Sequence, residues 1–174
     1  MLKIVLAFLF LTFAINTKVL GRRTTLMLCP KGWIHLILSC YFFSTTKTTM
    51  SRARTSCQNQ GGDLALPRNI EEHNAIWKVA KEKKFTYPWI GLVEKGKDKF
   101  YTLDGKTPTY TNWGSTQPNI GGNEPCVIYH SGDNNGRWHD APCNTNNYYI
   151  CQQTVRKCRT YNQLAYKAIG CVRT

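Results

Sequence analysis

The order of apolar and polar positions predicts a first helix soon after an N-terminal strand-rich segment. Met50, Ala53 and Cys57 follow one another at spacings of three and four residues, which puts them on one helical face. The threonines directly before Met50 are suited to an N-cap, and Gly61-Gly62 is suited to the C-terminal end. We therefore expect this helix to begin near Met50 and to end before Gly61.

A second helix is predicted to follow at once. Asn69, with Glu72 three residues later, resembles a capping box. Ile76, Val79 and Ala80 then form one apolar face. The lysines on the other side of this helix are interpreted as a solvated surface.

Short runs of β-branched and aromatic residues predict strands around these helices. Two runs precede the first helix, at residues 33–38 and 40–43, with Ser39 between them. The later runs are residues 89–93, 100–103, 126–129 and 148–151. Residues 113–125 and 130–136 are rich in Gly and Asn and predict loops. This order predicts a single α+β domain with an antiparallel sheet.

The two ends of the chain have different compositions from the middle. Residues 1–21 have a basic start, an apolar run and small residues at a cleavage position, so they are interpreted as a signal peptide. The alternative is a membrane anchor, but the apolar run is shorter than the roughly 20 residues that span a bilayer. We expect a secreted protein without a transmembrane segment. Residues 22–28 form a short basic lead, and residues 154–174 form a basic C-terminal extension.

All eight cysteines lie after the predicted signal peptide: Cys29, Cys40, Cys57, Cys126, Cys143, Cys151, Cys158 and Cys171. An even number in an exported chain predicts four disulfides. Structural zinc is the competing interpretation, but the sequence contains neither a Cys-x-x-Cys pair nor His-Glu-x-x-His.

The formal net charge of +13 favours acidic partners, with sulfated or other anionic polysaccharides as the first candidates and no specific nucleic acid. A basic soluble surface without any anion site is the alternative. The four histidines are not accompanied by a nucleophile and an orienting group, so we predict that the protein is not an enzyme.

Several motifs together resemble the C-type lectin family. They are Gly-Gly-Asp-Leu-Ala at 61–65, Trp-Ile-Gly-Leu at 89–92 and Trp-His-Asp-Ala-Pro-Cys at 138–143. The resemblance covers about residues 29–153. It implies two helices flanking small antiparallel sheets, a long ligand-binding loop and the bridges Cys29–Cys40, Cys57–Cys151 and Cys126–Cys143. Cys158 and Cys171 remain, and they are paired by elimination and by nearness in sequence.

The resemblance also assigns a calcium site to Gln117, Asn119, Glu124 and Asp140. Calcium binds six to eight oxygen atoms, and these four side chains all carry oxygen. The hydroxyls of a sugar can complete the calcium shell while the same side chains bond to the sugar. The alternative is that the two amides are turn formers and the two carboxylates lie on the surface.

Three departures from the family pattern affect the predicted site. Gln117-Pro118-Asn119 lacks the acidic residue of the mannose-type and galactose-type triplets, so we expect lower calcium affinity. His139 takes a position usually held by Asn or Asp, where it either bonds to the sugar or faces solvent. Val93 and Lys97 occupy the acidic positions of a second calcium site, which is therefore expected to be lost.

These observations predict a secreted, calcium-dependent lectin for microbial or cell-surface glycans. Its predicted sugar-binding residues are Gln117, Asn119, Glu124, His139 and Asp140. Retention of the mannose-type Asn119 favours mannose, fucose or N-acetylglucosamine over galactose. The alternative is a calcium-independent lectin-like protein that binds polyanions, a protein or a mineral surface.

Overall fold

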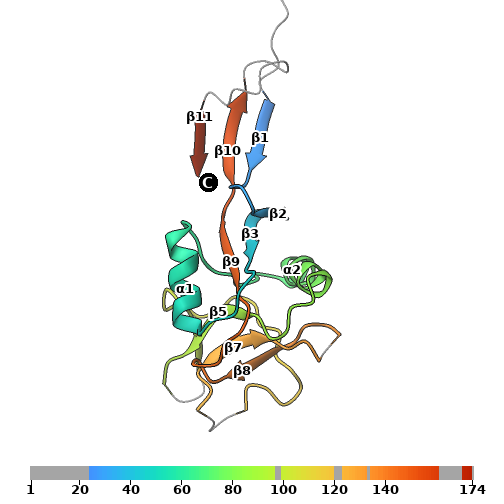
Figure 1. Cartoon of the computed structure of the whole chain (residues 1–174), viewed down its shortest axis with the longest axis vertical. Helices are drawn as coiled ribbons and strands as arrows, with labels where there is room; N and C mark the ends of the chain where they lie inside the picture. The colour runs from blue at the N-terminus through green and yellow to red at the C-terminus, as the bar shows by residue number, and fades with distance from the viewer. Residues whose placement is uncertain (1–23, 97–98, 120–122, 133, 161–169, 174) are drawn as a thin grey trace, which may run out of the picture.

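The computed structural model describes residues 24–96, 99–119, 123–132, 134–160 and 170–173, which form a compact body and a projecting sheet (Figure 1). The predicted signal peptide lies outside the described residues. Among the described residues, no helix combines the length and the apolar character needed to cross a membrane.

The body contains two four-stranded sheets whose neighbouring strands run antiparallel. The first sheet, in spatial order, consists of β2 (Ile34–Leu36), β3 (Ser39–Phe43), β9 (Ile150–Thr154) and β4 (Asp63–Leu64). The second consists of β6 (Phe100–Thr102), β5 (Trp89–Glu94), β7 (Cys126–Tyr129) and β8 (Trp138–Ala141). The predicted α+β class with small antiparallel sheets is confirmed.

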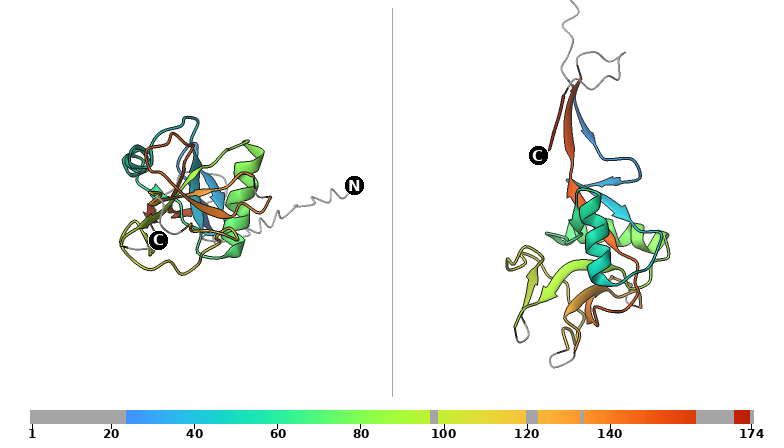
Figure 2. Two further views of the ribbon diagram at one scale, coloured as in Figure 1. Left: turned by 90° about the horizontal axis from the view of Figure 1, so that it is seen from below. Right: turned by 60° about the vertical axis from the view of Figure 1, so that its left-hand side comes forward.

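The helices α1 (Met50–Asn59) and α2 (Ile70–Glu82) lie on opposite sides of β3 and β9 (Figures 1 and 2). The predicted inner face of α1 is buried at Met50, Ala53 and Cys57. Thr49 occupies the N-cap, but its side chain makes no capping hydrogen bond. The chain leaves α1 through Gly61, whose φ of +82° is favourable for glycine.

The predicted capping box of α2 is only half formed. Asn69 Oδ1 accepts a hydrogen bond from the backbone N–H of Glu72 at 2.9 Å. The Glu72 carboxylate accepts instead from the backbone N–H of Arg68 at 2.9 Å, and it also pairs with the Arg68 guanidinium. Glu72 is almost fully buried, so a charged pair joins the start of α2 to the residue preceding its cap.

The turn of the first hairpin differs from the prediction. Ser39 was expected to separate two strands, but it belongs to β3 and pairs with Leu36 of β2. Ile37 and Leu38 form the turn, and Ile37 has a φ of +55°. A β-branched residue rarely adopts this conformation, which explains why the sequence did not mark the turn.

The core packs the sheets against both helices. Trp89 and Trp138 are fully buried, and Trp77 is 4% exposed, so all three are core residues. Trp77 stacks on Tyr129 at 5.6 Å between ring centroids. The indole N–H of Trp89 donates to the carbonyl of Thr48 at 2.9 Å, which ties the start of α1 to β5.

Four disulfides staple the chain. Cys57–Cys151 joins α1 to β9, and Cys126–Cys143 joins β7 to the segment after β8. Cys29–Cys40 ties the chain before β2 to β3, and Cys158–Cys171 joins two strands of the projecting sheet. These are the four pairs expected from the sequence.

The projecting sheet consists of β1 (Thr24–Leu28), β10 (Arg156–Thr160) and β11 (Gly170–Arg173), with β10 in the centre. We call these three strands the stalk. Only Val155 separates β9 from β10, so the stalk continues directly from the first sheet of the body (Figure 2). In Figure 1 the stalk lies at the opposite end of the long axis from β7 and β8. The sequence analysis predicted no secondary structure for residues 22–28 or residues 154–174.

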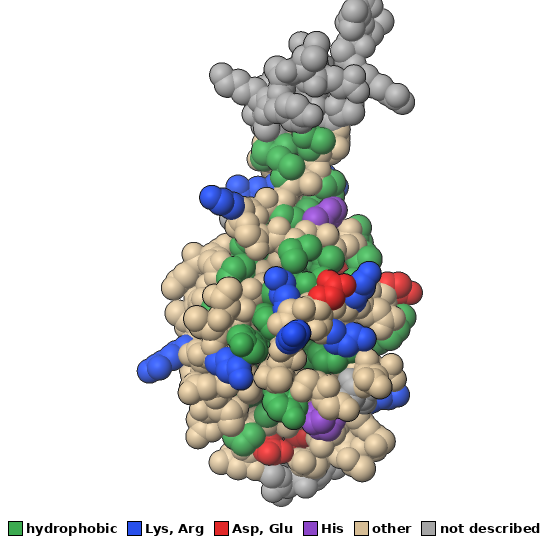
Figure 3. Space-filling model, turned by 45° about the vertical axis from the view of Figure 1, so that its right-hand side comes forward, with side chains coloured by type: hydrophobic (Ala, Val, Ile, Leu, Met, Phe, Trp, Pro, Cys, Tyr) green, Lys and Arg blue, Asp and Glu red, His purple; other side chains and the backbone are tan. Residues whose placement is uncertain are grey.

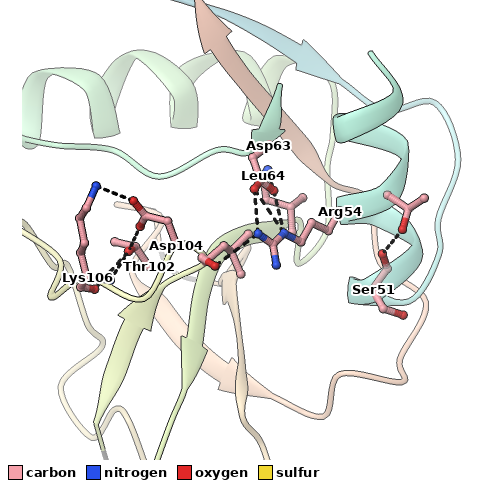
Figure 4. A network of polar contacts seen from close by, with 9 residues as sticks. Ser51, Arg54, Asp63, Leu64, Thr102, Asp104 and Lys106 are labelled. Carbon is pink, nitrogen blue, oxygen red and sulfur yellow. Dashed lines mark hydrogen bonds and ion pairs between the residues drawn. The ribbon is translucent and has the colours of Figure 1, made fainter. Parts of the chain in front are cut away.

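Polar contacts connect α1 to the β6 side of the body (Figure 4). The Arg54 guanidinium donates to both carboxylate oxygens of Asp63 at 3.1–3.2 Å and to the carbonyl of Leu103 at 3.3 Å. In the turn after β6, Asp104 accepts from Lys106 at 2.7 Å and from the Thr102 hydroxyl. These bonds, that of Lys106 foremost, lower the pKa of Asp104 to about 2.

Candidate functional site

The predicted loop at residues 113–125 is anchored to β8 at its start. The backbone N–H of Gly114 donates to the carbonyl of Trp138 at 3.0 Å, and the N–H of Trp138 donates to the carbonyl of Asn112 at 2.7 Å. The buried Trp138 ring packs edge-on against the rings of Tyr110 and Trp113. The loop therefore begins on a rigid aromatic base, which limits the positions of the side chains that follow.

Asn119 lies next to two of the other predicted calcium ligands, Glu124 and Asp140. Its backbone N–H donates to Asp140 Oδ1 at 3.1 Å. When its side-chain nitrogen faces the carboxylates, it donates to Asp140 Oδ2 at 2.9 Å and to Glu124 Oε2 at 3.1 Å. Glu124 lies two residues before Cys126 of β7, and Asp140 lies on β8 opposite Val127. The β7–β8 pairing thus brings carboxylates from distant segments to one amide.

Gln117, the fourth predicted ligand, lies on the same loop. Its backbone N–H donates to the carbonyl of Gly114 at 3.1 Å, and the peptide bond to Pro118 is cis. Its side-chain oxygen is buried and has no hydrogen-bond partner. A buried amide oxygen without a donor loses favourable interactions, so this oxygen is a candidate ligand for a cation.

His139 is held between two features that the sequence did not indicate. Its ring stacks on His130, which belongs to the second predicted loop, at 4.0 Å and an interplanar angle of 13°. A Cβ atom on Gly114 would lie 2.8 Å from His139 Nε2 and 3.2 Å from Gln117 Cγ. Gly114 therefore leaves room for two predicted site residues. His130 directly follows β7 and is brought beside His139 by the β7–β8 pairing, whose register the sequence analysis did not predict.

The residues present fit a hard cation better than a transition metal. The described part of the chain holds no group of three or more His, Cys, Asp or Glu side chains placed to bind a metal. The candidate set instead combines two carboxylates with two amides, and this oxygen chemistry suits calcium. Val93 is partly buried within β5, whereas Lys97 lies outside the described residues, so the expected loss of a second site remains a prediction.

The Lectin C-type domain family model matches residues 46–153. The chain is 30% identical over 134 residues to CD209 antigen-like protein A of Mus musculus, covering 75% of this chain and 54% of that protein. It is 31% identical over 138 residues to human C-type lectin domain family 17, member A, covering 79% of this chain and 34% of that protein. The chain thus spans about half the length of these relatives, or less.

Solved structures with a similar fold include a carbohydrate-recognition domain and an antifreeze protein. The carbohydrate-recognition domain of cow CD23, solved in the presence of a GlcNAc2Man3 oligosaccharide, has a TM-score of 0.64 and 28% identity, covering 74% of this chain and 98% of that one. A calcium-independent type II antifreeze protein has a TM-score of 0.66 and 26% identity, covering 75% of this chain and 97% of that one. The family match over residues 46–153 spans more than half of this protein, which therefore belongs to the C-type lectin domain family, a family of non-enzymatic carbohydrate-binding proteins.

Proposed function

We propose that this protein binds carbohydrate through one calcium ion held by Gln117, Asn119, Glu124 and Asp140. The observation that supports the proposal is the convergence of the Glu124 and Asp140 carboxylates on the side chain of Asn119. In the absence of a cation, the amide nitrogen is the positively polarised group between the two acids. A half-turn of the amide would present its oxygen to the same point, as a cation requires.

Each residue has a distinct role in this proposal. Glu124 and Asp140 supply the negative charge, and Gln117 and Asn119 supply neutral oxygens. Bound calcium would accept two adjacent hydroxyls of a sugar, while the same side chains donate to or accept from those hydroxyls. With two acids and two amides the site has a low charge count, so we propose a modest calcium affinity. Asn119 favours mannose, fucose or N-acetylglucosamine over galactose.

Alanine substitution of Glu124 tests this proposal. Glu124→Ala is expected to abolish calcium-dependent retention on immobilised mannose and to weaken calcium binding by at least about tenfold, because half of the ligand charge is lost. Glu82→Ala, in an exposed position of α2, is the matched control and should leave both unchanged. Sugar retention by the parent protein in EDTA would support the calcium-independent alternative, which the antifreeze neighbour represents.

We propose, as a second candidate function, that a lysine surface beside α2 binds sulfated polysaccharides. Lys47 lies over the Tyr148 ring at 4.9 Å, and Lys83 lies over the Phe43 ring at 6.0 Å. Phe85 contacts both rings, so the two lysines share one region of the surface. The exposed Lys78, Lys81 and Lys84 extend this region along α2. Several basic side chains are visible on this side of the body in Figure 3.

Heparin chromatography tests the second candidate. The protein is expected to elute at moderate salt with or without calcium, since counterion release and screening weaken such contacts. Substituting Lys78, Lys81, Lys83 and Lys84 by Gln should lower the eluting salt concentration, whereas Arg156→Gln/Lys157→Gln in the stalk should have little effect. The opposite ranking would move the anion site to the stalk, and retention that does not weaken as the salt concentration rises would argue against an electrostatic origin.

We also propose that the protein is secreted and acts on microbial or cell-surface glycans. The support is the predicted signal peptide at residues 1–21 together with four disulfides in the described chain. N-terminal sequencing of protein collected from culture medium tests this idea. A new terminus near residue 22 is expected, and retention of the full chain in the cell membrane would contradict it.

A further inference from the structure

The strand β1 (Thr24–Leu28) forms one edge of the stalk (Figure 1). Among the described strands it pairs only with β10, so its other side presents the backbone N–H and C=O groups of an edge strand. Thr25 is exposed, and Met27 and Leu28 are 37% and 40% exposed. This edge therefore combines backbone hydrogen-bonding groups with exposed apolar side chains, which are the features that a strand of another chain can pair with.

The strand β1 lacks the features that protect an edge strand from pairing with another chain. Such features are charged side chains, proline and β-bulges. The sequence of β1, Thr-Thr-Leu-Met-Leu, contains no charged residue and no proline, and its pairing with β10 shows no shift of register. The charged residues of the stalk all lie on the other two strands: Arg156, Lys157 and Arg159 on β10, and Arg173 on β11. Of the two edge strands, β11 thus carries a charge and β1 does not.

This distribution of charge favours a second copy of the chain as the partner of β1. An acidic partner would be attracted to the basic strands β10 and β11, whereas a neutral strand matches β1. If two β1 strands paired, the two β10 strands would lie three strand spacings apart, about 14 Å, which exceeds the Debye length of about 8 Å at physiological salt. The basic strands would then repel one another only weakly. Two identical strands are also self-complementary across a two-fold axis, the commonest symmetry of soluble oligomers.

An antiparallel pair of β1 strands centred on Leu26 determines how the two copies would be oriented. Leu26 would lie opposite Leu26 of the second copy, and Thr25 would lie opposite Met27 of the second copy. The chain enters the body directly after β1, where the Cys29–Cys40 bridge begins. Because the two strands run in opposite directions, the two bodies would lie at opposite ends of the shared sheet. Each candidate calcium site lies far from its own stalk, so the two sites would face away from each other (Figure 1).

We propose that two copies of this protein join through β1, so that the three-stranded sheets of both stalks become one antiparallel sheet. The pairing itself does not depend on sugar binding. Its consequence rests on the proposed function: with the sugar sites at opposite ends, the dimer bridges two glycan-bearing particles and does not bind twice to one surface. A five-residue strand offers a small interface, so the dimer is a weak one, with a dissociation constant on the order of 10 µM.

Sedimentation velocity of the protein collected from culture medium tests the pairing. At about 100 µM, ten times the expected dissociation constant, the parent protein should be mainly dimeric with or without calcium. Thr25→Lys/Met27→Lys should weaken dimerisation about tenfold, because it places like charges opposite each other across the two-fold axis. Val172→Lys is the matched control, since it adds a charge at an exposed position of the other edge strand, β11, and it should leave the dimer intact.

A charge-swap experiment tests which strands meet. Thr25→Glu/Met27→Glu carries the opposite charge at the same two positions of β1. An equimolar mixture of the lysine and glutamate variants should dimerise more tightly than either variant alone, because each lysine then faces a glutamate. A dimer in the mixture also shows that both variants have a folded stalk, and circular dichroism checks the body of each variant.

Three results would overturn the pairing through β1. They are a parent protein that stays monomeric at about 100 µM, a dimer that survives in both β1 variants, and a mixture that dimerises no better than its components. Loss of the dimer in Val172→Lys alone would place the contact on β11 instead.

Agglutination of mannan-coated beads in calcium tests the consequence of pairing. The parent protein should agglutinate the beads, whereas the lysine variant should bind to them without agglutination. A dimeric parent that binds but does not agglutinate would contradict the bridging arrangement. A dimeric parent that does not bind would contradict the proposed function and leave the β1 pairing in place, so the two failures are distinguishable.

Discussion

At the scale of single residues, one amide organises the candidate calcium site. Asn119 donates to Asp140 through its backbone N–H and, when its side-chain nitrogen faces the carboxylates, to both Asp140 and Glu124. The neighbouring oxygen of Gln117 is buried without a donor. The Asn119 amide thus provides donors to the two carboxylates, while the Gln117 oxygen has no donor. A bound cation could take the place of the amide donors and also bind the Gln117 oxygen.

His139→Asn is predicted to raise calcium affinity by about a factor of ten, because an amide oxygen would replace a ring whose nitrogen is a poor calcium ligand. The change also removes the ring stack with His130. His130→Asn is the matched control, since it removes the same stack without placing an oxygen next to Asp140. Titration calorimetry measures the calcium affinity of the parent protein and of the two variants. Equal affinities for both variants would mean that His139 only packs.

Ile37→Asn is predicted to stabilise the protein by about 0.5–1 kcal/mol. Ile37 has a φ of +55°, which costs an ordinary residue about 1–2 kcal/mol and costs Asn less. The Ile37 side chain is 51% exposed, so little burial is lost. Leu38→Asn, at the neighbouring and more exposed turn position, should give no gain in urea unfolding. An equal change in both variants would show that conformation at residue 37 is not the cause.

The candidate site could be predicted from the sequence only in part. The four ligands were assigned through the family resemblance; the structure places Asn119 beside Glu124 and Asp140, and their role in binding calcium stays a prediction. The His130 stack depends on the register of the β7–β8 pairing, because His130 directly follows β7 and His139 lies on β8. The sequence analysis predicted a strand at residues 126–129 but did not predict this register, so it did not link His130 to the site.

At the scale of elements, hydrophobic spacing predicted α1 and α2 because each buries one face against the sheets. It did not predict the side-chain partners at the helix ends. Glu72 satisfies the sequence pattern of a capping box, yet its carboxylate turns to Arg68 because burial demands a charged partner. The same pairing raises the pKa of the Arg68 guanidinium above its usual value.

Arg68→Met is predicted to destabilise the protein by about 2–3 kcal/mol, because it leaves the buried Glu72 carboxylate with only backbone donors. The Arg68 side chain is 53% exposed, so Glu72→Met should cost less, since the guanidinium left behind reaches water. The double variant should be more stable than Arg68→Met alone. Urea unfolding measures all three, and additive costs would contradict the pairing argument.

At the scale of the whole molecule, the candidate site and the stalk lie at opposite ends of the long axis (Figure 1). The stalk escaped sequence prediction because its strands pair the start of the chain with its end, and Thr24–Leu28 shows no alternation to mark a face. Its outer strands β1 and β11 each pair only with β10 among the described strands. We therefore expect the stability of the stalk to depend on the Cys158–Cys171 bridge more than the stability of the body does.

Removing the stalk bridge with Cys158→Ser/Cys171→Ser is predicted to loosen β10 and β11 locally, by about 3 kcal/mol for a loop of this length. Because the stalk contributes little to the two core clusters, the melting temperature of the body and calcium-dependent sugar binding should stay close to those of the parent. Cys57→Ala/Cys151→Ala, which opens the bridge between α1 and β9, is the contrasting control and should lower the melting temperature of the whole body. Hydrogen exchange should rise in residues 156–160 while residues 150–154 remain protected. An equal loss of stability in both double variants would mean that body and stalk unfold as one cooperative unit.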